Sequence, residues 1–174
     1  PKSPAEEEAF WLFDPTAITD VVSKQEVIST PWPTINQEIQ GGYKRGELVE
    51  ICALSKTGKT SWLVNELAHS LKQGHSAGYV TIADLDRYGI GLMVAKVLLR
   101  KTKDDLLSQP NKLAALKRAM TRRNIKLEVA DYTNRLTRVS EIDRVVERWR
   151  EAHQERLVKV VVDRLEEAVP SEKV

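Results

Sequence analysis

The sequence lacks several features that would mark particular classes of protein. Cys52 is the single cysteine among 174 residues, which excludes an internal disulfide and a zinc site built from cysteines. No apolar run approaches the roughly 20 residues that a membrane-spanning helix needs. The N-terminal stretch PKSPAEEEAFWLF also lacks the basic-then-apolar layout of a signal peptide. We therefore expect a cytosolic protein in which Cys52 is a small buried residue.

Neither the net charge nor the spacing of the histidines points to a particular partner or metal. The formal net charge is +2, so the composition predicts no global attraction to nucleic acid or membranes. The three histidines, His69, His75 and His153, are scattered without metal-ligand spacing, and we expect them on helices or at the surface. With 41% apolar and 30% charged residues, the chain has the balance of one globular domain with a hydrophobic core.

Two regions differ in character. Residues 1–30 predict an N-terminal arm, in which an acidic run at 6–8 precedes the aromatic residues Phe10, Trp11 and Phe13. These aromatics either anchor a neighbouring protomer or fold back onto their own domain. Residues 31–174 predict the main body, where apolar segments alternate with helical patterns.

That alternation predicts an α/β fold with a mostly parallel sheet flanked by helices. Pro110 and Gly74 are placed to begin and to end helices, and Ser140 with Asp143 resembles a helix start. The predicted strands are ELVEIC (47–52), AGYVTIA (77–83), IKLEVA (125–130) and LVKVVVD (157–163); the predicted helices cover 60–73, 91–101 and 110–123 and follow Ser140, with Ile142, Val145, Val146 and Trp149 on one apolar face.

The stretch ALSKTGKT (53–60) fits the phosphate-loop pattern G-x-x-x-x-G-K-[ST], except that Ala53 replaces the first glycine. This chemistry needs backbone N–H groups and a helix N-terminus facing a phosphate, which Gly58 permits by close approach. Lys59 would reach the β- and γ-phosphates, and Thr60 would ligate Mg²⁺. The alternative is an ordinary Gly-Lys-Thr turn at a helix start. The candidate nucleotide-binding residues are Ser55, Lys56, Thr57, Gly58, Lys59, Thr60 and Ser61.

Carboxylates at strand ends supply the other candidate site residues. Asp163 ends the last predicted strand, where it would support the Mg²⁺ bound by Thr60, or serve as a turn residue. Asp84 follows the second predicted strand and is the candidate that orients the attacking water. Asp86 is its rival, and either residue has the alternative role of helix N-cap. Asp84 and Lys59 are the candidate catalytic residues.

Several segments together resemble the RecA-like motor domain of DnaB-type replicative helicases, including phage primase-helicases. The resemblance lies in STPWPTINQEIQGGYKRGELVEI before the phosphate loop, in ALSKTGKTSWLVNELAHSL, and in VADYTNRLTRVSEIDRVVERWREAH followed by LVKVVVDRLEEAV. In YVTIADLD, Asp84 stands where the family has its catalytic glutamate, and Arg164 departs from the family pattern after Asp163. KaiC-type and RadA-type ATPases, and plasmid-type replicative helicases, share the lead-in.

The resemblance implies a RecA-like P-loop NTPase that binds ATP and Mg²⁺ and assembles as a homo-oligomeric ring. As part of a helicase it would couple ATP hydrolysis to movement on single-stranded DNA, in the cytoplasm of a bacterial or phage-infected cell. The family motor continues past the point that corresponds to Val174, so we expect a fragment of a longer helicase. The alternatives are a reduced relative, a RecA-like regulatory ATPase, and a degenerate interaction module that binds no nucleotide.

A basic stretch between residues 111 and 126 contains no acidic residue. It would contact a nucleic-acid backbone or form the solvated face of a helix, and it lacks interleaved aromatics for base stacking. Its basic residues are Lys112, Lys117, Arg118, Arg122, Arg123 and Lys126.

Overall fold

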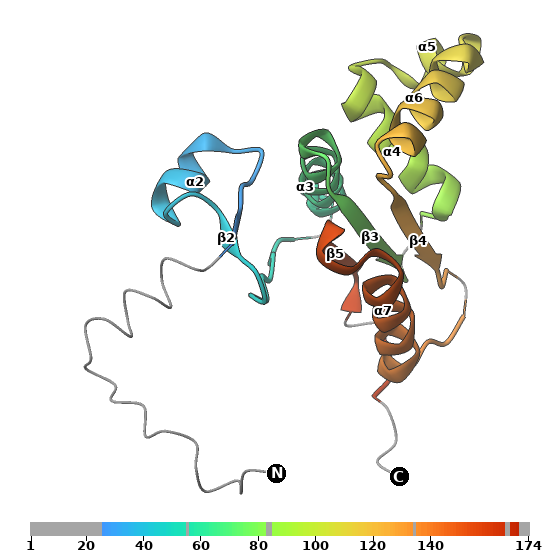
Figure 1. Cartoon of the computed structure of the whole chain (residues 1–174). Helices are drawn as coiled ribbons and strands as arrows, with labels where there is room; N and C mark the ends of the chain where they lie inside the picture. Colours follow the sequence, from blue (N-terminus) through green and yellow to red (C-terminus); the bar gives the residue numbers. More distant parts are fainter. Residues whose placement is uncertain (1–25, 55, 83–84, 134, 166–167, 171–174) are drawn as a thin grey trace, which may run out of the picture.

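The computed structural model describes residues 26–54, 56–82, 85–133, 135–165 and 168–170 (Figure 1). They form an α/β fold in which a small parallel three-stranded sheet is flanked by helices. The strands β3 (Ser76–Thr81), β4 (Leu127–Asp131) and β5 (Leu157–Asp163) lie in the order β4-β3-β5. The helices of this body are α3 (Lys59–Gln73), α4 (Arg87–Leu99), α5 (Lys103–Ser108), α6 (Pro110–Arg122), α7 (Val139–His153) and the 3-10 turn η2 (Gln154–Arg156).

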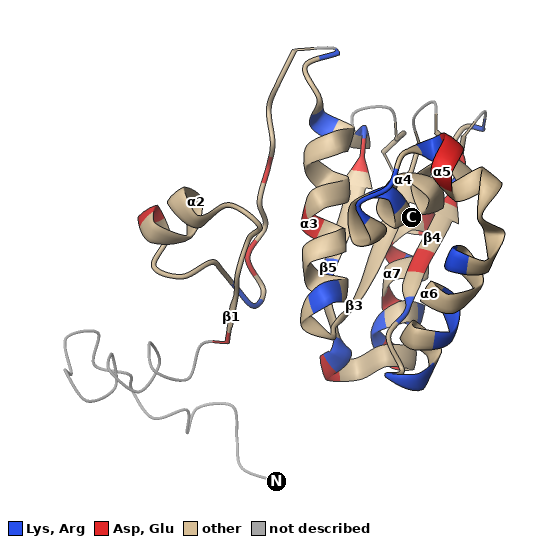
Figure 2. Ribbon diagram, turned by 90° about the horizontal axis from the view of Figure 1, so that it is seen from above, with Lys and Arg blue, Asp and Glu red and all other residues tan. Residues whose placement is uncertain are grey.

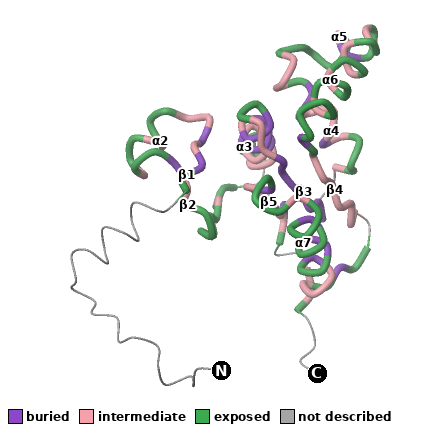
Figure 3. The backbone as a smooth tube through the Cα atoms, viewed as in Figure 1, coloured by how far each residue is buried: buried purple, intermediate pink, exposed green. Residues whose placement is uncertain are grey.

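Helices cover both faces of the sheet because strand side chains alternate between the faces. Tyr79 and Val161 pack with α3 and α4 in one apolar cluster. Val80 packs with α7 in the other, where Trp149 lies on the backbone of Gly78. The buried segments gather in α3 and β3, whereas α5 and α6 are mostly exposed (Figure 3). Within the described residues, no helix is long and apolar enough to cross a membrane.

Most of the predicted elements are present, because their signals are local. β5 has the predicted bounds, α6 begins at Pro110, and α3 ends where Gly74 adopts a φ of 99°. α4 begins earlier than predicted, since Asp86 caps it by accepting a 2.7 Å hydrogen bond from the Gly89 amide.

The start of α7 differs in detail from the prediction. The carboxylate that closes its first turn belongs to Glu141, which accepts a 3.0 Å hydrogen bond from the Arg138 amide, so the helix does not start from a Ser140–Asp143 pair. The predicted apolar face is correct, since Ile142, Val145 and Trp149 are buried, and Val146 packs beside them.

The predicted strand at residues 47–52 is wrong. No strand forms there; Leu48 is 96% exposed, and Cys52 is exposed rather than buried. A strand needs hydrogen bonds to a partner edge. In the described part of the chain β5 pairs only with β3, and residues 46–51 lie across a groove from β5 instead of pairing with its free edge. The apolar side chains of Leu48 and Val49 are therefore left exposed.

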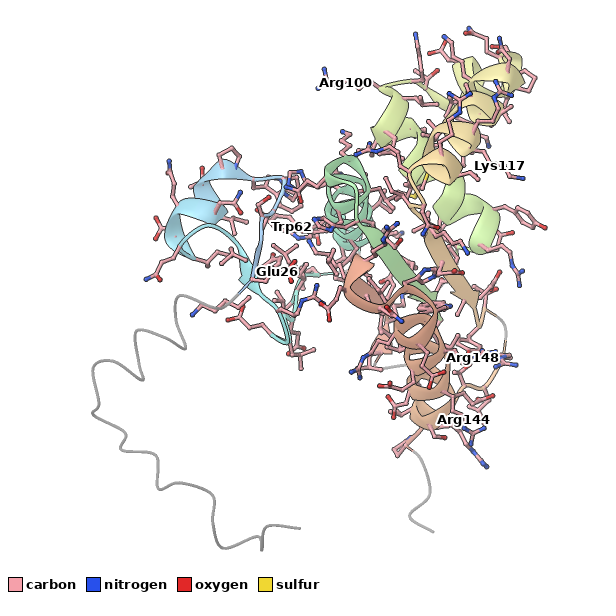
Figure 4. All side chains as sticks on the ribbon, viewed as in Figure 1. Glu26, Trp62, Arg100, Lys117, Arg144 and Arg148 are labelled. Carbon is pink, nitrogen blue, oxygen red and sulfur yellow. The ribbon has the colours of Figure 1, made fainter. Side chains whose placement is uncertain are left out.

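Residues 26–46, here called the N-terminal unit, pack beside α3. The unit contains β1 (Val27–Ile28), which pairs antiparallel with β2 (Tyr43–Lys44), and the short helix α2 (Pro33–Glu38). Trp32 stacks on Trp62 of α3 with ring centroids 3.6 Å apart. Figure 4 shows Trp62 on the side of α3 that faces this unit. The unit therefore rests on the helix that follows the phosphate loop.

His69 makes this junction sensitive to pH. Its Nε2 lies 3.0 Å from Ser29 Oγ, and burial lowers its pKa, helped by Lys159 and Lys72 and opposed by Glu66. Because the folded pKa lies below the unfolded value of about 6.5, the unfolded chain takes up the proton first. This contribution to stability is present above the unfolded value and is lost as the pH falls through both values.

We expect the melting temperature to fall between pH 7.5 and pH 5.5, and the His69→Gln variant to show a smaller fall. Thermal unfolding followed by circular dichroism measures both. The Ser29→Ala variant is the control: it removes one hydrogen-bond partner but keeps the imidazole buried beside Lys159, so it should retain the wild-type pH dependence. Equal slopes for wild type and His69→Gln would contradict the assignment.

Candidate functional site

In the described part of the loop before α3, a glycine in a left-handed backbone conformation directly precedes the helix. Gly58 has a φ of 99°, and an added Cβ there would meet no atom within 4 Å, so the position is open to close approach. Lys56 also has a positive φ of 63°. Thr57 Oγ1 closes the turn by donating a 2.6 Å hydrogen bond to the Leu54 carbonyl. Ala53 keeps a negative φ, so alanine at the first loop position carries no strain.

The side chains of this loop face solvent around the helix start. Lys56, Thr57, Gly58 and Ser61 are exposed, and Lys59 and Thr60 are half-buried in the first turn of α3. Ser55 lies outside the described residues. The unsatisfied amides of the first helical turn and of the turn before it give the N-terminus of α3 a partial positive charge, which favours a bound anion.

Thr60 and Asp163 meet, although 103 positions separate them in the sequence. Thr60 Oγ1 donates a 2.9 Å hydrogen bond to Asp163 Oδ2. Asp163 is 5% exposed and ends β5, at the edge where the strands of a parallel sheet present their carboxyl ends. The fold thus joins the end of the phosphate-loop pattern to the strand-terminal carboxylate that the sequence assigns to the same site.

Tyr79 is a third member of this cluster that the sequence did not reveal. Its side chain is fully buried, and its hydroxyl donates a 2.6 Å hydrogen bond to the same oxygen, Asp163 Oδ2. Burial, reinforced by the Asp163 carboxylate, raises the pKa of Tyr79 far above its usual range, so the phenol stays protonated and donates. No local sequence signal points to Tyr79, because its contact with Asp163 depends on the register between β3 and β5, in which Thr81 pairs with Asp163.

The other carboxylates near the strand ends do not join the Thr60–Asp163 contact in the described residues. Asp84 lies outside the described residues. Asp86 is the N-cap of α4, which is the structural alternative that the sequence left open for it. Asp131 ends β4, where it accepts a hydrogen bond of 2.6 Å from Thr133 Oγ1, and this bond, with help from Arg87, lowers its pKa. Asp131 is therefore already held by its own loop.

A groove of about 470 Å³ lies between the exposed segment 46–51 and β5. Lys59 and Asp163 both line it, so the groove opens beside the Thr60–Asp163 contact. Glu66 and Lys159 also line it and form a buried ion pair between α3 and β5.

The residues at this site fit a magnesium ion that is shared with phosphate. Mg²⁺ prefers oxygen ligands and commonly takes only one or two protein groups, completing its shell with water and phosphate oxygens. The Thr60 hydroxyl and the Asp163 carboxylate supply such oxygens. Within the described ranges, no group of three or more His, Cys, Asp or Glu side chains could hold a metal by protein ligands alone. The site is thus suited to a metal that arrives with its ligand.

Other predicted surfaces lie apart from this cluster. Most of the basic residues between 111 and 126 are exposed on and after α6 (Figure 2), and Lys117 points outward from that helix (Figure 4). The arm aromatics Phe10, Trp11 and Phe13 lie outside the described residues. The His153 side chain is mostly buried at the end of α7, and its Nε2 lies within hydrogen-bond distance of Glu128 Oε1, at 2.8 Å.

Comparison with known proteins finds no family model that matches the chain and no curated protein that is similar to it in sequence. The fold defines an α/β protein with a three-stranded parallel sheet, and the site defines a helix N-terminus beside a strand-terminal carboxylate.

Proposed function

We propose that this chain binds a nucleoside triphosphate with Mg²⁺ at the N-terminus of α3. The observation that carries the proposal is the 2.9 Å contact between Thr60 Oγ1 and Asp163 Oδ2. A hydroxyl beside a helix N-terminus and a carboxylate at a strand tip are the two protein groups that phosphate-loop NTPases use around their metal. The parallel sheet between helices supports the assignment to the RecA-like P-loop class.

Each residue has a distinct role in this proposal. The backbone amides of residues 55–61 bind the phosphates, and the Lys59 ammonium neutralises charge on the β- and γ-phosphates. Thr60 and Asp163 hold Mg²⁺, which supplies charge stabilisation to the phosphate oxygens when it is bound. Asp84 orients the water that attacks the γ-phosphate, and it is one methylene shorter than the glutamate common in the resembling family.

We further propose that this nucleotide site belongs to a ring-forming, ATP-driven DNA helicase. The support is the sequence resemblance around the loop and through the segment that ends in Asp163. In comparable sites an arginine from a neighbouring subunit raises the rate about 10³–10⁵-fold. An isolated subunit is therefore expected to bind nucleotide but to hydrolyse it slowly, with single-stranded DNA engaged by the assembled ring.

Replacing Lys59 with alanine is expected to weaken binding of a fluorescent ATP analogue about 10–100-fold, because hydrogen bonds to charged groups contribute roughly 1.5–3 kcal/mol. Fluorescence anisotropy in the presence of Mg²⁺ measures the affinity. Lys72→Ala is the matched control, since it removes the same charge from an exposed position in the last turn of the same helix. Binding that survives Lys59→Ala unchanged would remove the support for the phosphate loop and for the helicase assignment.

A further inference from the structure

We propose that Tyr79 is a positioning residue of the metal site, where its buried hydroxyl fixes the Asp163 carboxylate in the orientation that a hydrated divalent cation requires. This inference rests on the proposed function and assigns a part of the site that the phosphate-loop pattern does not contain. Tyr79 does not touch the phosphates or the metal; it acts through Asp163.

The geometry sets the orientation of the carboxylate from two sides. Thr60 Oγ1 donates at 2.9 Å from α3 and Tyr79 donates at 2.6 Å from β3, and both bonds end on Oδ2. A carboxylate oxygen has two lone-pair sites, so these two donors occupy Oδ2 fully. They oppose rotation about the Cβ–Cγ bond, and we assign the other oxygen, Oδ1, to the hydrated cation.

The position of Tyr79 makes the constraint rigid. Tyr79 and Asp163 stand on adjacent parallel strands, with Tyr79 opposite Val161 and Thr81 opposite Asp163 in the ladder. The tyrosine ring is packed among Val64, Leu67 and Val161 in the apolar cluster under α3. A ring held by close packing cannot follow a moving carboxylate, so the carboxylate must keep the position that the ring dictates.

Burying the Tyr79 hydroxyl would cost free energy if Asp163 did not accept its hydrogen bond. A buried phenol without an acceptor would lose its hydrogen bond to water and gain nothing. A phenylalanine in this place would fill the same cluster without that requirement. The hydroxyl, rather than the ring, is therefore the part of Tyr79 that the site uses.

The Tyr79→Phe variant tests the inference. Its affinity for a fluorescent ATP analogue in EDTA should match wild type, whereas the Mg²⁺ concentration for half-maximal effect should rise about tenfold, the size typical for losing a partner of a metal ligand. Mn²⁺ titration followed by electron paramagnetic resonance, with the non-hydrolysed analogue bound, reports metal binding directly and without turnover. Thermal unfolding of the variant shows that it is folded.

Two further variants separate positioning from packing. Tyr43→Phe is the matched control, because it removes a hydroxyl that donates to another buried carboxylate, Glu66, at 3.3 Å; it should leave the Mg²⁺ dependence unchanged. In an Asp163→Asn background, Tyr79→Phe should cause no further loss of metal affinity. Tyr79 acts only through the Asp163 carboxylate, which this background has already removed.

The outcomes are distinguishable. Wild-type protein that binds no nucleotide, or a Lys59→Ala variant that binds it normally, overturns the proposed function together with this inference. Normal nucleotide binding with an unchanged Mg²⁺ and Mn²⁺ dependence in Tyr79→Phe overturns the inference alone. A shift in Tyr43→Phe that equals the shift in Tyr79→Phe also overturns it, since both would then reflect general loosening.

Discussion

Replacing Trp149 with alanine is expected to lower the free energy of unfolding by about 3–5 kcal/mol, the range for truncating a large buried aromatic side chain. Trp149 is 8% exposed and belongs to the cluster that joins α7 to the sheet. The neighbouring strand cannot fill the space, because the residue beneath the ring is Gly78. Urea unfolding followed by circular dichroism measures the change, and Leu136→Ala, at an exposed apolar residue, is the control. A loss below about 1 kcal/mol would contradict the packing described.

Gly78 supplies an independent check on the same contact. A Cβ at this position would lie 2.6 Å from Trp149 Cε3, so Gly78→Ala must displace the ring. In the wild-type background we expect a loss of about 1–3 kcal/mol from overpacking. In the Trp149→Ala background the added methyl group enters the space that the indole left, so the loss should shrink or reverse. Additive losses would mean that the two positions do not touch.

Replacing Lys159 with methionine is expected to cost about 3–5 kcal/mol, because it leaves the buried carboxylate of Glu66 without its charge partner. The Glu66 side chain is 4% exposed, and that of Lys159 is 12% exposed. The remaining partner of Glu66 is the Tyr43 hydroxyl; burial and the Glu66 carboxylate raise the pKa of that tyrosine to about 12, so it stays a donor. A neutral hydroxyl replaces only part of the stabilisation that the ammonium gives.

Two comparisons identify the cause. The double variant Glu66→Leu with Lys159→Met removes both charges, and it should recover most of the stability lost in the single variant. Arg45→Met is the matched control at an exposed ion pair with Glu26, where the loss should stay below about 1 kcal/mol. Chemical denaturation of the four proteins decides the question; a double variant as unstable as Lys159→Met would show that packing, rather than unpaired charge, dominates.

The elements that were predictable from the sequence depend on local signals. Gly74 ends α3, Pro110 begins α6, and the run LVKVVVD forms β5 with the predicted bounds. Each signal acts within one or two turns of chain, through backbone conformation or a short apolar period. The parallel direction of the strands also follows from a general rule, since strands that alternate with helices form parallel sheets.

What was not predictable depends on partners that are distant in sequence. Residues 47–52 have the composition of a strand, but composition does not determine whether the segment pairs with the free edge of β5 or stays apart from it. The N-terminal unit was missed because its two strands are only two residues long and 15 positions of chain separate Ile28 from Tyr43. Tyr79 was missed because its partner is fixed by the register between β3 and β5, which no pattern within either strand specifies.

The stacked rings of Trp32 and Trp62 have a spectroscopic consequence. Two indoles with centroids 3.6 Å apart and planes inclined by 19° couple their strong electronic transitions, so the far-ultraviolet circular dichroism should contain an exciton couplet. Trp62 stands two positions after Thr60 on α3, while Trp32 belongs to the N-terminal unit. The couplet thus reports, without an added dye, whether the N-terminal unit is packed against α3.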